Sequence, residues 1–463
     1  MPRPPIRFPE FARDLILIFA AGSACGLAQA QSDTWWHLRA GQDIWRDHRV
    51  SLVDRYSYTA TGSFWPDHEW LWQAIAYGLH SVGGMPLLAA VNGALAVGAL
   101  LLVLPRGRTT RLEVTLLLLA IPVLVGVWSL RPQVTSVFLL ALLLRQLHIG
   151  RWWAVPLVML LWANLHGAVA TGGVVLVAAC GAGLVTALRE RTPVARARLK
   201  ALAVVTALSA LLTLATPLGI RLWTYVLDSI ARSKDNHIAE WRSAFHLNLI
   251  SVGFWCWFVV VVLVLLMNRR RVVGWDLTLD AAVLIALAPF AMSAIRNVTF
   301  FVLAALPLVF ALTRRDVPDR PDDDVPHGRG ILRSVSGLVA CVVAIVWISQ
   351  PPRLEWHPLG PAAADAIRAC DGQVYTTYYG GGFLIWFVPD VPVFVDNRQD
   401  PYSPAIIDLG ALGPGQDFQT TFDKYGVRCA ALTSVDIGTR NVLEAAGWKP
   451  AFSDSQWVVL EAP

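Results

Sequence analysis

Long apolar blocks limit the fold of this chain more than any other feature of its sequence. Runs of roughly 18 or more apolar residues are candidates for membrane spans, since a helix satisfies all of its own backbone hydrogen bonds in lipid. Such blocks recur along most of the chain, and only 15% of its 463 residues are charged, against about 25% in soluble domains. The sequence therefore predicts a mainly helical membrane protein that crosses the bilayer many times.

We expect about eleven transmembrane helices. The candidate spans are 14–32, 84–104, 112–130, 133–148, 152–165, 167–188, 199–216, 250–267, 276–294, 297–313 and 331–349. The fourth and fifth are shorter than the ~20 residues of a full span, so they are expected to be tilted, broken or partial. Arginines before the first block and AQA at 28–30 also resemble a cleavable signal peptide, although we favour an uncleaved span.

The basic residues indicate the orientation of the spans. Alternate connections are rich in Arg and Lys, and the positive-inside rule makes these cytoplasmic. The remaining connections then lie on the opposite side, which we expect to be periplasmic, and they include loops 33–83 and 217–249 and everything after residue 350. The net charge of +5 is divided between the spans and does not form one stripe, so we attribute it to orientation and expect no nucleic-acid binding.

The C-terminal segment, 351–463, differs in character from the membrane domain, 1–350. Short segments rich in β-branched and aromatic residues predict strands, and two alanine-rich segments between them predict helices. The strands are expected at 372–378, 391–397, 427–433 and 456–462, and the helices at 361–370 and 440–447. This alternation predicts a small periplasmic α/β domain. If the segment is extracytoplasmic, Cys370 and Cys429 could form a disulfide.

The first loop holds the densest group of candidate catalytic residues. Asp33 and His37 are four residues apart and would share one face of a helix. Asp67, His68 and Glu69 follow between tryptophans. One of the acids could remove a proton from an acceptor hydroxyl. Alternatively, Asp33, Asp67 and Glu69 could hold a divalent cation such as Mg or Mn, because hard cations prefer oxygen ligands.

A purely structural interpretation of the same loop stays open. Asp33 could be the N-cap of an amphipathic helix at the membrane surface, with its tryptophans in the lipid headgroup layer. This interpretation explains Asp67, His68 and Glu69 less well, because solvent exposure alone does not account for three polar side chains between aromatic rings. The residue types alone do not separate the two interpretations of Asp33 and His37.

Arg131 and Arg296 are candidate ligands of a phosphate. Each lies at the periplasmic end of a predicted span beside an amide, Gln133 or Asn297. A guanidinium is always charged and can donate two parallel hydrogen bonds to one phosphate. Snorkelling toward lipid headgroups is the alternative, but the positive-inside rule favours arginine on the opposite side of the membrane.

Other polar groups carry weaker signals. His68, His166 and Glu240 are further candidates for substrate binding. His166 interrupts an apolar stretch, for which a hydrogen-bonded turn between helices is the favoured alternative, and Glu240 follows a polar run in loop 217–249. The glycines of YYGGGFLIW (378–386) lack a nucleotide loop's lysine and spacing, and they indicate tight turning. Charged residues at 396–402 predict a local salt-bridged turn. No Ser-His-Asp set, Walker motif, dinucleotide fingerprint or Cys/His zinc spacing occurs.

DTWWHLRAGQDIW (33–45), followed by DRYSYTATGSFWPDHEWL (54–71), resembles the first loop of a group of bacterial multi-span proteins. That group is similar to the GT-C superfamily of glycosyltransferases, which use polyprenyl-phosphate sugars. The resemblance continues through TPLGIRLWTYVL (216–227), IAEW (238–241), IRN (295–297) and GGGFLIWFVPDVPVFVDNRQDPY (380–402). It covers most of the chain in order, and its Trp-Trp-His loop is fairly specific to the group.

The resemblance implies a GT-C-like helical bundle and a catalytic or metal-binding acid just after the first span. Asp33 matches that position, with Asp67 and Glu69 as later acids. The adjacent pair of acids found in several GT-C families is absent here. The resemblance also implies that the C-terminal domain covers or contacts the acceptor site.

The leading functional hypothesis is glycosyl transfer from a polyprenyl-phosphate sugar to a lipid, glycan or protein acceptor of the cell envelope. Arg131 and Arg296 would hold the phosphate, and Asp33 would orient or deprotonate the acceptor hydroxyl. A transporter or flippase is the first alternative, but it would place its polar groups near the middle of the bilayer. A non-catalytic protein of envelope-polysaccharide assembly is the second.

Overall fold

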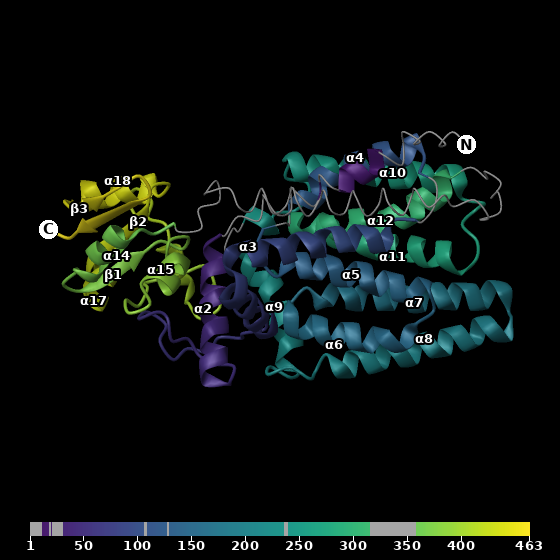
Figure 1. Cartoon of the computed structure of the whole chain (residues 1–463), viewed down its shortest axis with the longest axis horizontal. Coiled ribbons are helices and arrows are strands. Elements are labelled where there is room, and N and C mark those ends of the chain that lie inside the picture. The colour runs from purple at the N-terminus through teal and green to yellow at the C-terminus, as the bar shows by residue number, and fades with distance from the viewer. Residues whose placement is uncertain are drawn as a thin grey trace, which may run out of the picture. The chain divides into compact units, whose positions relative to one another are not determined.

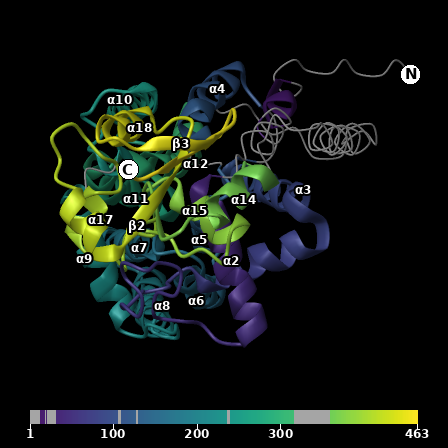
Figure 2. The same cartoon turned by 90° about the vertical axis from the view of Figure 1, so that its left-hand side faces the viewer.

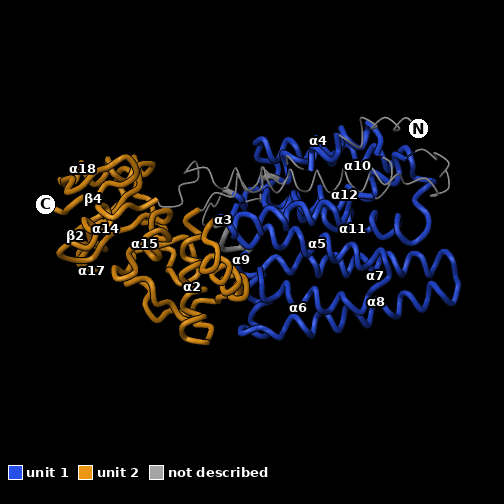
Figure 3. Tube along the Cα trace, in the orientation of Figure 1, with its two compact units in different colours: residues 1–28, 86–350 blue, residues 29–85, 351–463 orange. Residues whose placement is uncertain are grey.

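The computed structural model describes residues 12–17, 20, 31–105, 109–126, 129–235, 239–314 and 358–463. The chain divides into two compact units, which are coloured separately in Figure 3. Unit 1 comprises residues 1–28 and 86–350, and unit 2 comprises residues 29–85 and 351–463. The predicted span at 331–349 and most of the predicted first span lie outside the described residues.

Unit 1 is built from apolar helices that run side by side (Figure 1). After the second half of α3 (Trp70–Val103), its described helices are α4 (Arg111–Val125), α5 (Gln133–His148), α6 (Val155–Leu165), α7 (Val169–Glu190), α8 (Pro193–Leu212), α9 (Arg221–Asp235), α10 (Leu249–Asn268), α11 (Trp275–Ser293) and α12 (Val298–Thr313). The short 3-10 helices η1 (Trp152–Ala154), η2 (Ala239–Trp241) and η3 (Ile295–Asn297) lie between them. Helix α11 packs against α7 and α12, and α12 also packs against α4 and α10.

Five described helices are long and apolar enough to cross a membrane. They are Trp70–Val103, Val169–Glu190, Leu249–Asn268, Trp275–Ser293 and Ile295–Thr313, the last of which joins η3 to α12. The prediction of a mainly helical, multi-pass membrane protein is confirmed. Two shorter apolar helices, Gln133–His148 and Trp152–Leu165, coincide with the two short predicted spans. The full number of about eleven spans stays a prediction.

Local sequence explains where several helices begin and bend. Helix α10 starts with a capping box, in which Ser251 N–H donates to Asn248 Oδ1 (2.9 Å) and Asn248 N–H donates to Ser251 Oγ (2.8 Å). Helix α3 has a kink at Gly84, whose φ of 63° favours glycine, just before Pro86. The division between the two units falls at this kink.

Unit 2 combines the first loop with the C-terminal segment. Its helices are α2 (Ser32–Asp47), the first half of α3, α14 (Pro361–Arg368), α15 (Gly381–Phe387), α16 (Pro404–Asp408), α17 (Gln419–Tyr425) and α18 (Ile437–Ala445). Its strands are β1 (Gln373–Thr376), β2 (Val427–Thr433), β3 (Lys449–Ser453) and β4 (Trp457–Glu461). They form one sheet in the order β1-β2-β4-β3, part of which faces the viewer in Figure 2. Strand β1 is parallel to β2, and the other pairs are antiparallel.

Three of the four predicted strands belong to this sheet, and the predicted strand at 391–397 does not. Pro392 has no N–H to donate, and the segment instead pairs briefly with the first loop. Val393 N–H donates to Tyr56 O (3.0 Å), and Tyr58 N–H donates to Val393 O (3.1 Å). The fourth strand of the sheet is instead β3, which lies at the edge beside β4 and which we did not predict.

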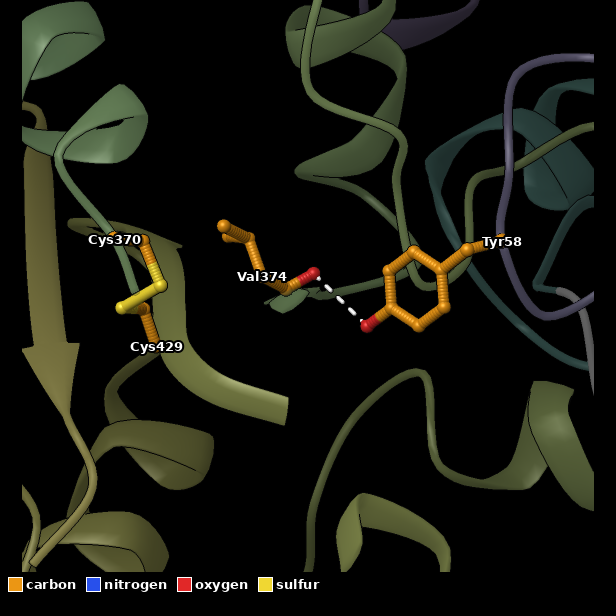
Figure 4. The surroundings of a disulfide bond; sticks show 4 residues. All are labelled: Tyr58, Cys370, Val374 and Cys429. Atoms are coloured by element: carbon orange, nitrogen blue, oxygen red, sulfur yellow. Dashed lines mark hydrogen bonds between the residues drawn. A yellow bond between two sulfur atoms is a disulfide. The ribbon is translucent and has the colours of Figure 1, made fainter. Parts of the chain in front are cut away.

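A disulfide joins Cys370, just after α14, to Cys429 on β2 (Figure 4). The pairing considered from the sequence is therefore present. Close to it, the hydroxyl of Tyr58 donates a hydrogen bond to the carbonyl of Val374 (3.1 Å). The first loop thus contributes directly to the core of the C-terminal segment, where Ala60 is also buried.

Candidate functional site

Asp33 lies in the first turn of α2. The N-cap of this helix is Gln31, whose backbone N–H donates to Thr34 Oγ1 (3.1 Å), so the alternative that Asp33 is the N-cap is wrong. A carboxylate in the first turn is favoured by the helix dipole. The side-chain amide of Asn397 donates to Asp33 Oδ1. An acid of the first loop and an amide of the C-terminal segment therefore meet within unit 2.

Close packing of α15 against other segments, one of which is α2, explains two of the three consecutive glycines. A Cβ on Gly382 would overlap Ser32, and one on Gly381 would overlap the carbonyl of Val395. Residues 378–380 form a turn, as expected, but none of the glycines 380–382 has a positive φ, so backbone strain is not what requires glycine there. Glycine is required here because side-chain atoms would separate these segments.

Glu69 lies between two histidines. Its Oε2 is 3.5 Å from His37 Nε2, and its Oε1 is 3.6 Å from His68 Nε2. The ring of His37 stacks on Trp36 with 3.6 Å between centroids and meets the edge of Trp72 at 5.0 Å. The structure thus brings together three of the predicted residues, and a protonated histidine here would be stabilised by the carboxylate.

Two adjacent tryptophans of the first loop, Trp35 and Trp36, are buried in protein, whereas Trp45 is exposed. Trp35 and Trp36 are only 1% and 7% exposed. Trp35 packs against Trp386 and Phe387 of the C-terminal segment, with centroids 6.3 and 4.7 Å away. The interpretation that this pair lies in a headgroup layer is therefore wrong, because the rings fill the core of unit 2.

Asp67 is buried just before α3. Burial raises the pKa of Asp67 to about 8, although Gln73 Nε2 donates to its Oδ1 (2.6 Å) and opposes the shift. The side chain lines a small hollow together with Asp43, Tyr56 and Trp65. At neutral pH this carboxyl is mostly protonated, so it acts as a hydrogen-bond donor more readily than as a base.

Within the described ranges, no three or more His, Cys, Asp or Glu side chains gather closely enough to hold a metal ion. Asp33 meets Asn397, Asp67 meets Gln73, and Glu69 meets two histidines. These residues do not fit a shared cation site, and the divalent cation stays a prediction without support from geometry.

The predicted arginines come together in unit 1. Arg131 Nη2 is 3.3 Å from Glu240 Oε2, and Arg296 Nη1 is 3.2 Å from Glu240 Oε1. The guanidinium of Arg296 also lies over the ring of Trp241, 4.6 Å from its centroid. Burial alone would raise the pKa of Glu240, but the two guanidiniums outweigh it and hold that pKa below its usual range.

Helix ends add to the positive potential of this cluster. Arg131 precedes the N-terminus of α5 by two residues, and Arg296 lies in η3, directly before α12. Helices α5 and α12 pack against each other. Because helix N-termini carry partial positive charge and unpaired N–H groups, the cluster has the chemistry of an anion site. Asn297, the N-cap residue of α12, uses its side-chain amide to donate to Phe290 O (3.2 Å).

His166 forms part of a buried turn after α6. Its Nδ1 is 2.6 Å from Ser136 Oγ, which also accepts a hydrogen bond from Trp162 Nε1 (2.7 Å). Asn164 donates to the carbonyls of Leu160 (2.9 Å) and Ala215 (3.1 Å). These contacts agree with the hydrogen-bonded turn favoured from the sequence.

Arg398 forms an ion pair with the first loop that we did not predict from the sequence. We expected only local pairing, and Asp396 Oδ2 indeed lies 2.7 Å from Arg398 Nη2. However, Arg398 Nη1 is also 2.6 Å from Asp54 Oδ1 of the first loop, and all three side chains are fully buried. The guanidinium is 4.9 Å from the ring centroids of both Tyr56 and Trp65. In the sequence, only the opposite charges of Asp54 and Arg398 could have indicated this ion pair.

Searches with the sequence find no matching protein family and no matching curated protein. Solved structures do match the fold. Archaeal oligosaccharyltransferase AglB from Archaeoglobus fulgidus, in complex with an inhibitory peptide and a dolichol-phosphate, matches with a TM-score of 0.56 and 12% identity, over 92% of this chain and 70% of that chain. ArnT from Cupriavidus metallidurans bound to undecaprenyl phosphate matches with a TM-score of 0.51 and 14% identity, over 97% and 96%.

This chain has a GT-C-like fold. An Archaeoglobus fulgidus oligosaccharyltransferase in complex with Zn and sulfate also matches, with a TM-score of 0.53 and 12% identity, over 90% of this chain and 68% of that chain. Identities this low establish the architecture only, and activity has to be argued from the residues.

Proposed function

We propose that the protein transfers a sugar from a polyprenyl-phosphate donor to an envelope acceptor, at the periplasmic face of a bacterial inner membrane. The observation that carries this proposal is the joining of Arg131 and Arg296 through Glu240 at the N-terminal ends of α5 and α12. Solved structures of the same fold with dolichol-phosphate or undecaprenyl phosphate support a lipid-linked phosphate as the ligand.

In the proposed reaction, the acceptor hydroxyl oxygen bonds to the anomeric carbon of the sugar while the bond from that carbon to the phosphate oxygen breaks. Polyprenyl phosphate leaves, and Arg131, Arg296 and the helix ends stabilise its growing charge. The acceptor's proton passes to Asp33. Asp67 is the weaker candidate for the base, because burial raises its pKa to about 8 and keeps it protonated.

The remaining predicted residues receive supporting roles. Glu69 fixes His37 and His68 near the start of α3, and we assign these three to acceptor recognition. His166 and Asn297 order the helix ends that carry the arginines. No described set of ligands fits a divalent cation, so no step is assigned to one.

The periplasmic placement of unit 2 rests on its disulfide. Disulfides such as Cys370–Cys429 persist in oxidising compartments, and the bacterial periplasm is one of them. This agrees with the orientation that the positive-inside rule predicts. Labelling of an engineered cysteine at an exposed position of unit 2 by an impermeant reagent in intact spheroplasts tests it, and labelling only after lysis would contradict it.

Envelope glycan mass spectrometry of a deletion strain tests the function and the base together. Complementation with wild type should restore a sugar modification that Asp33→Asn fails to restore at equal protein level. Asp417→Asn, which changes an exposed acid of the same unit, is the matched control and should restore it fully. Unchanged glycans in the deletion strain would refute the transferase, and full rescue by Asp33→Asn would refute the role of Asp33.

A further inference from the structure

Glu240 compensates half of the positive charge in the proposed phosphate site. Two guanidiniums and one carboxylate leave a formal charge of +2 − 1 = +1. Its contacts of 3.3 and 3.2 Å are longer than the ~2.8 Å of strong charge-assisted bonds. The side chain is 34% exposed, so solvent and ligands can approach it.

Backbone contacts hold Glu240 beside the arginines. Ala244 N–H donates to Met292 O (3.0 Å), and Ile295 N–H donates to Arg242 O (2.8 Å), which joins the segment after η2 to the segment around η3. The stacking of Arg296 on Trp241 adds a side-chain contact between the same segments. We therefore expect the carboxylate to stay near a bound phosphate and to share the guanidiniums with it.

The two lipids that the proposed reaction handles differ in charge. The donor, a polyprenyl-phosphate sugar, is a phosphodiester with one negative charge. The leaving polyprenyl phosphate is a monoester, whose second ionisation near pH 6 gives it close to two charges at neutral pH. Because Coulomb energies scale with the product of the charges, a nearby carboxylate repels the monoester about twice as strongly as the diester.

We propose that Glu240 is a specificity-determining residue. Its carboxylate lowers the affinity of the site for the leaving polyprenyl phosphate more than it lowers the affinity for the sugar donor. This proposal rests on the proposed function, because it assumes that Arg131 and Arg296 bind the lipid's phosphate. With Glu240 in place, the product is held less tightly and the next donor competes for the site more easily. A site with the two guanidiniums alone would retain its product.

The test measures binding of two probes to the purified full-length protein in detergent. The monoester probe is undecaprenyl phosphate, and the diester probe is its methyl ester. In Glu240→Gln, affinity should rise about tenfold for the monoester but only about threefold for the diester, since the energies scale with ligand charge. Glu240→Ala should act in the same direction, and it provides a second variant if the first does not fold.

Two controls separate charge at the site from charge in general. Glu240→Asp keeps the carboxylate and should keep affinities near wild type, whereas Asp228→Asn removes an exposed acid of α9 and should change neither affinity. Equal changes for both probes, or weaker binding in Glu240→Gln, would refute the role of Glu240 and leave the proposed function standing. Absence of binding of either probe to the wild type would refute both.

Discussion

Arg398 and Glu240 each lie between two side chains of opposite charge, but in opposite environments. Arg398 in unit 2 joins two aspartates with all side chains 0% exposed and contacts of 2.6 and 2.7 Å. Glu240 in unit 1 joins two arginines with longer contacts, and the three side chains are 16% to 34% exposed. We infer that the buried triad of Asp54, Arg398 and Asp396 holds segments together, while the accessible triad of Arg131, Glu240 and Arg296 keeps charge available for a ligand.

The buried triad predicts the largest effect on stability. Arg398→Gln leaves Asp54 and Asp396 buried without their cation, which should lower the free energy of unfolding by about 3–5 kcal/mol. Chemical unfolding of the full chain in detergent, followed by tryptophan fluorescence, measures this loss. Arg368→Gln, which removes an exposed arginine paired with Asp390, is the control and should change little. Equal stability of the two variants would remove the contrast between the triads.

We expect removal of the disulfide to cause the next largest loss of stability in the same unit. Replacing Cys370 and Cys429 by serine frees a loop with a sequence separation of 59, which should cost about 2–4 kcal/mol. The same unfolding assay measures it, with reduced wild type as the reference. If the double variant matched oxidised wild type, the covalent link would add nothing to the noncovalent contacts of the first loop.

The accessible triad predicts an effect on binding and not on stability. Arg131→Gln or Arg296→Gln should each weaken binding of undecaprenyl phosphate about 100-fold, because each removes a charge-assisted donor. Their stability should fall less than that of Arg398→Gln, because the side chains of this cluster are partly exposed. Arg189→Gln, an exposed change at the end of α7, serves as the control. Loss of stability without loss of binding would reverse our assignment of the two triads.

The buried acid Asp67 should have the smallest effect, which is on the pH dependence of stability. Burial raises its pKa to about 8, so the folded protein keeps a proton that the unfolded chain releases near pH 4. Stability should therefore fall as pH rises from about 4 to about 8, by about 2 kcal/mol between pH 6 and 8. Asp67→Asn should lack this component, and an unchanged pH profile in that variant would contradict the burial argument.

Prediction from the sequence succeeded where a pattern acts locally. Apolar length and composition indicated the membrane helices, and segments rich in β-branched and aromatic residues indicated β1, β2 and β4. The prediction of a sheet strand at 391–397 was wrong because this segment pairs with the backbone around Tyr56, which lies more than 300 residues earlier in the chain. The interpretation of Trp35 was wrong for a related reason, since its burial against Trp386 and Phe387 cannot be predicted from its immediate neighbours in the sequence.

Hydropathy, periodicity and charge are properties of short segments, so the sequence was enough to predict a helical membrane protein, its small C-terminal sheet and the residue types of an anion site. The contacts of Glu240 with both Arg131 and Arg296 became known from the three-dimensional structure. The same holds for the ion pair of Asp54 and Arg398, which joins the first loop to the C-terminal segment. Such pairings depend on which distant segments pack together, and packing is set by the whole core at once.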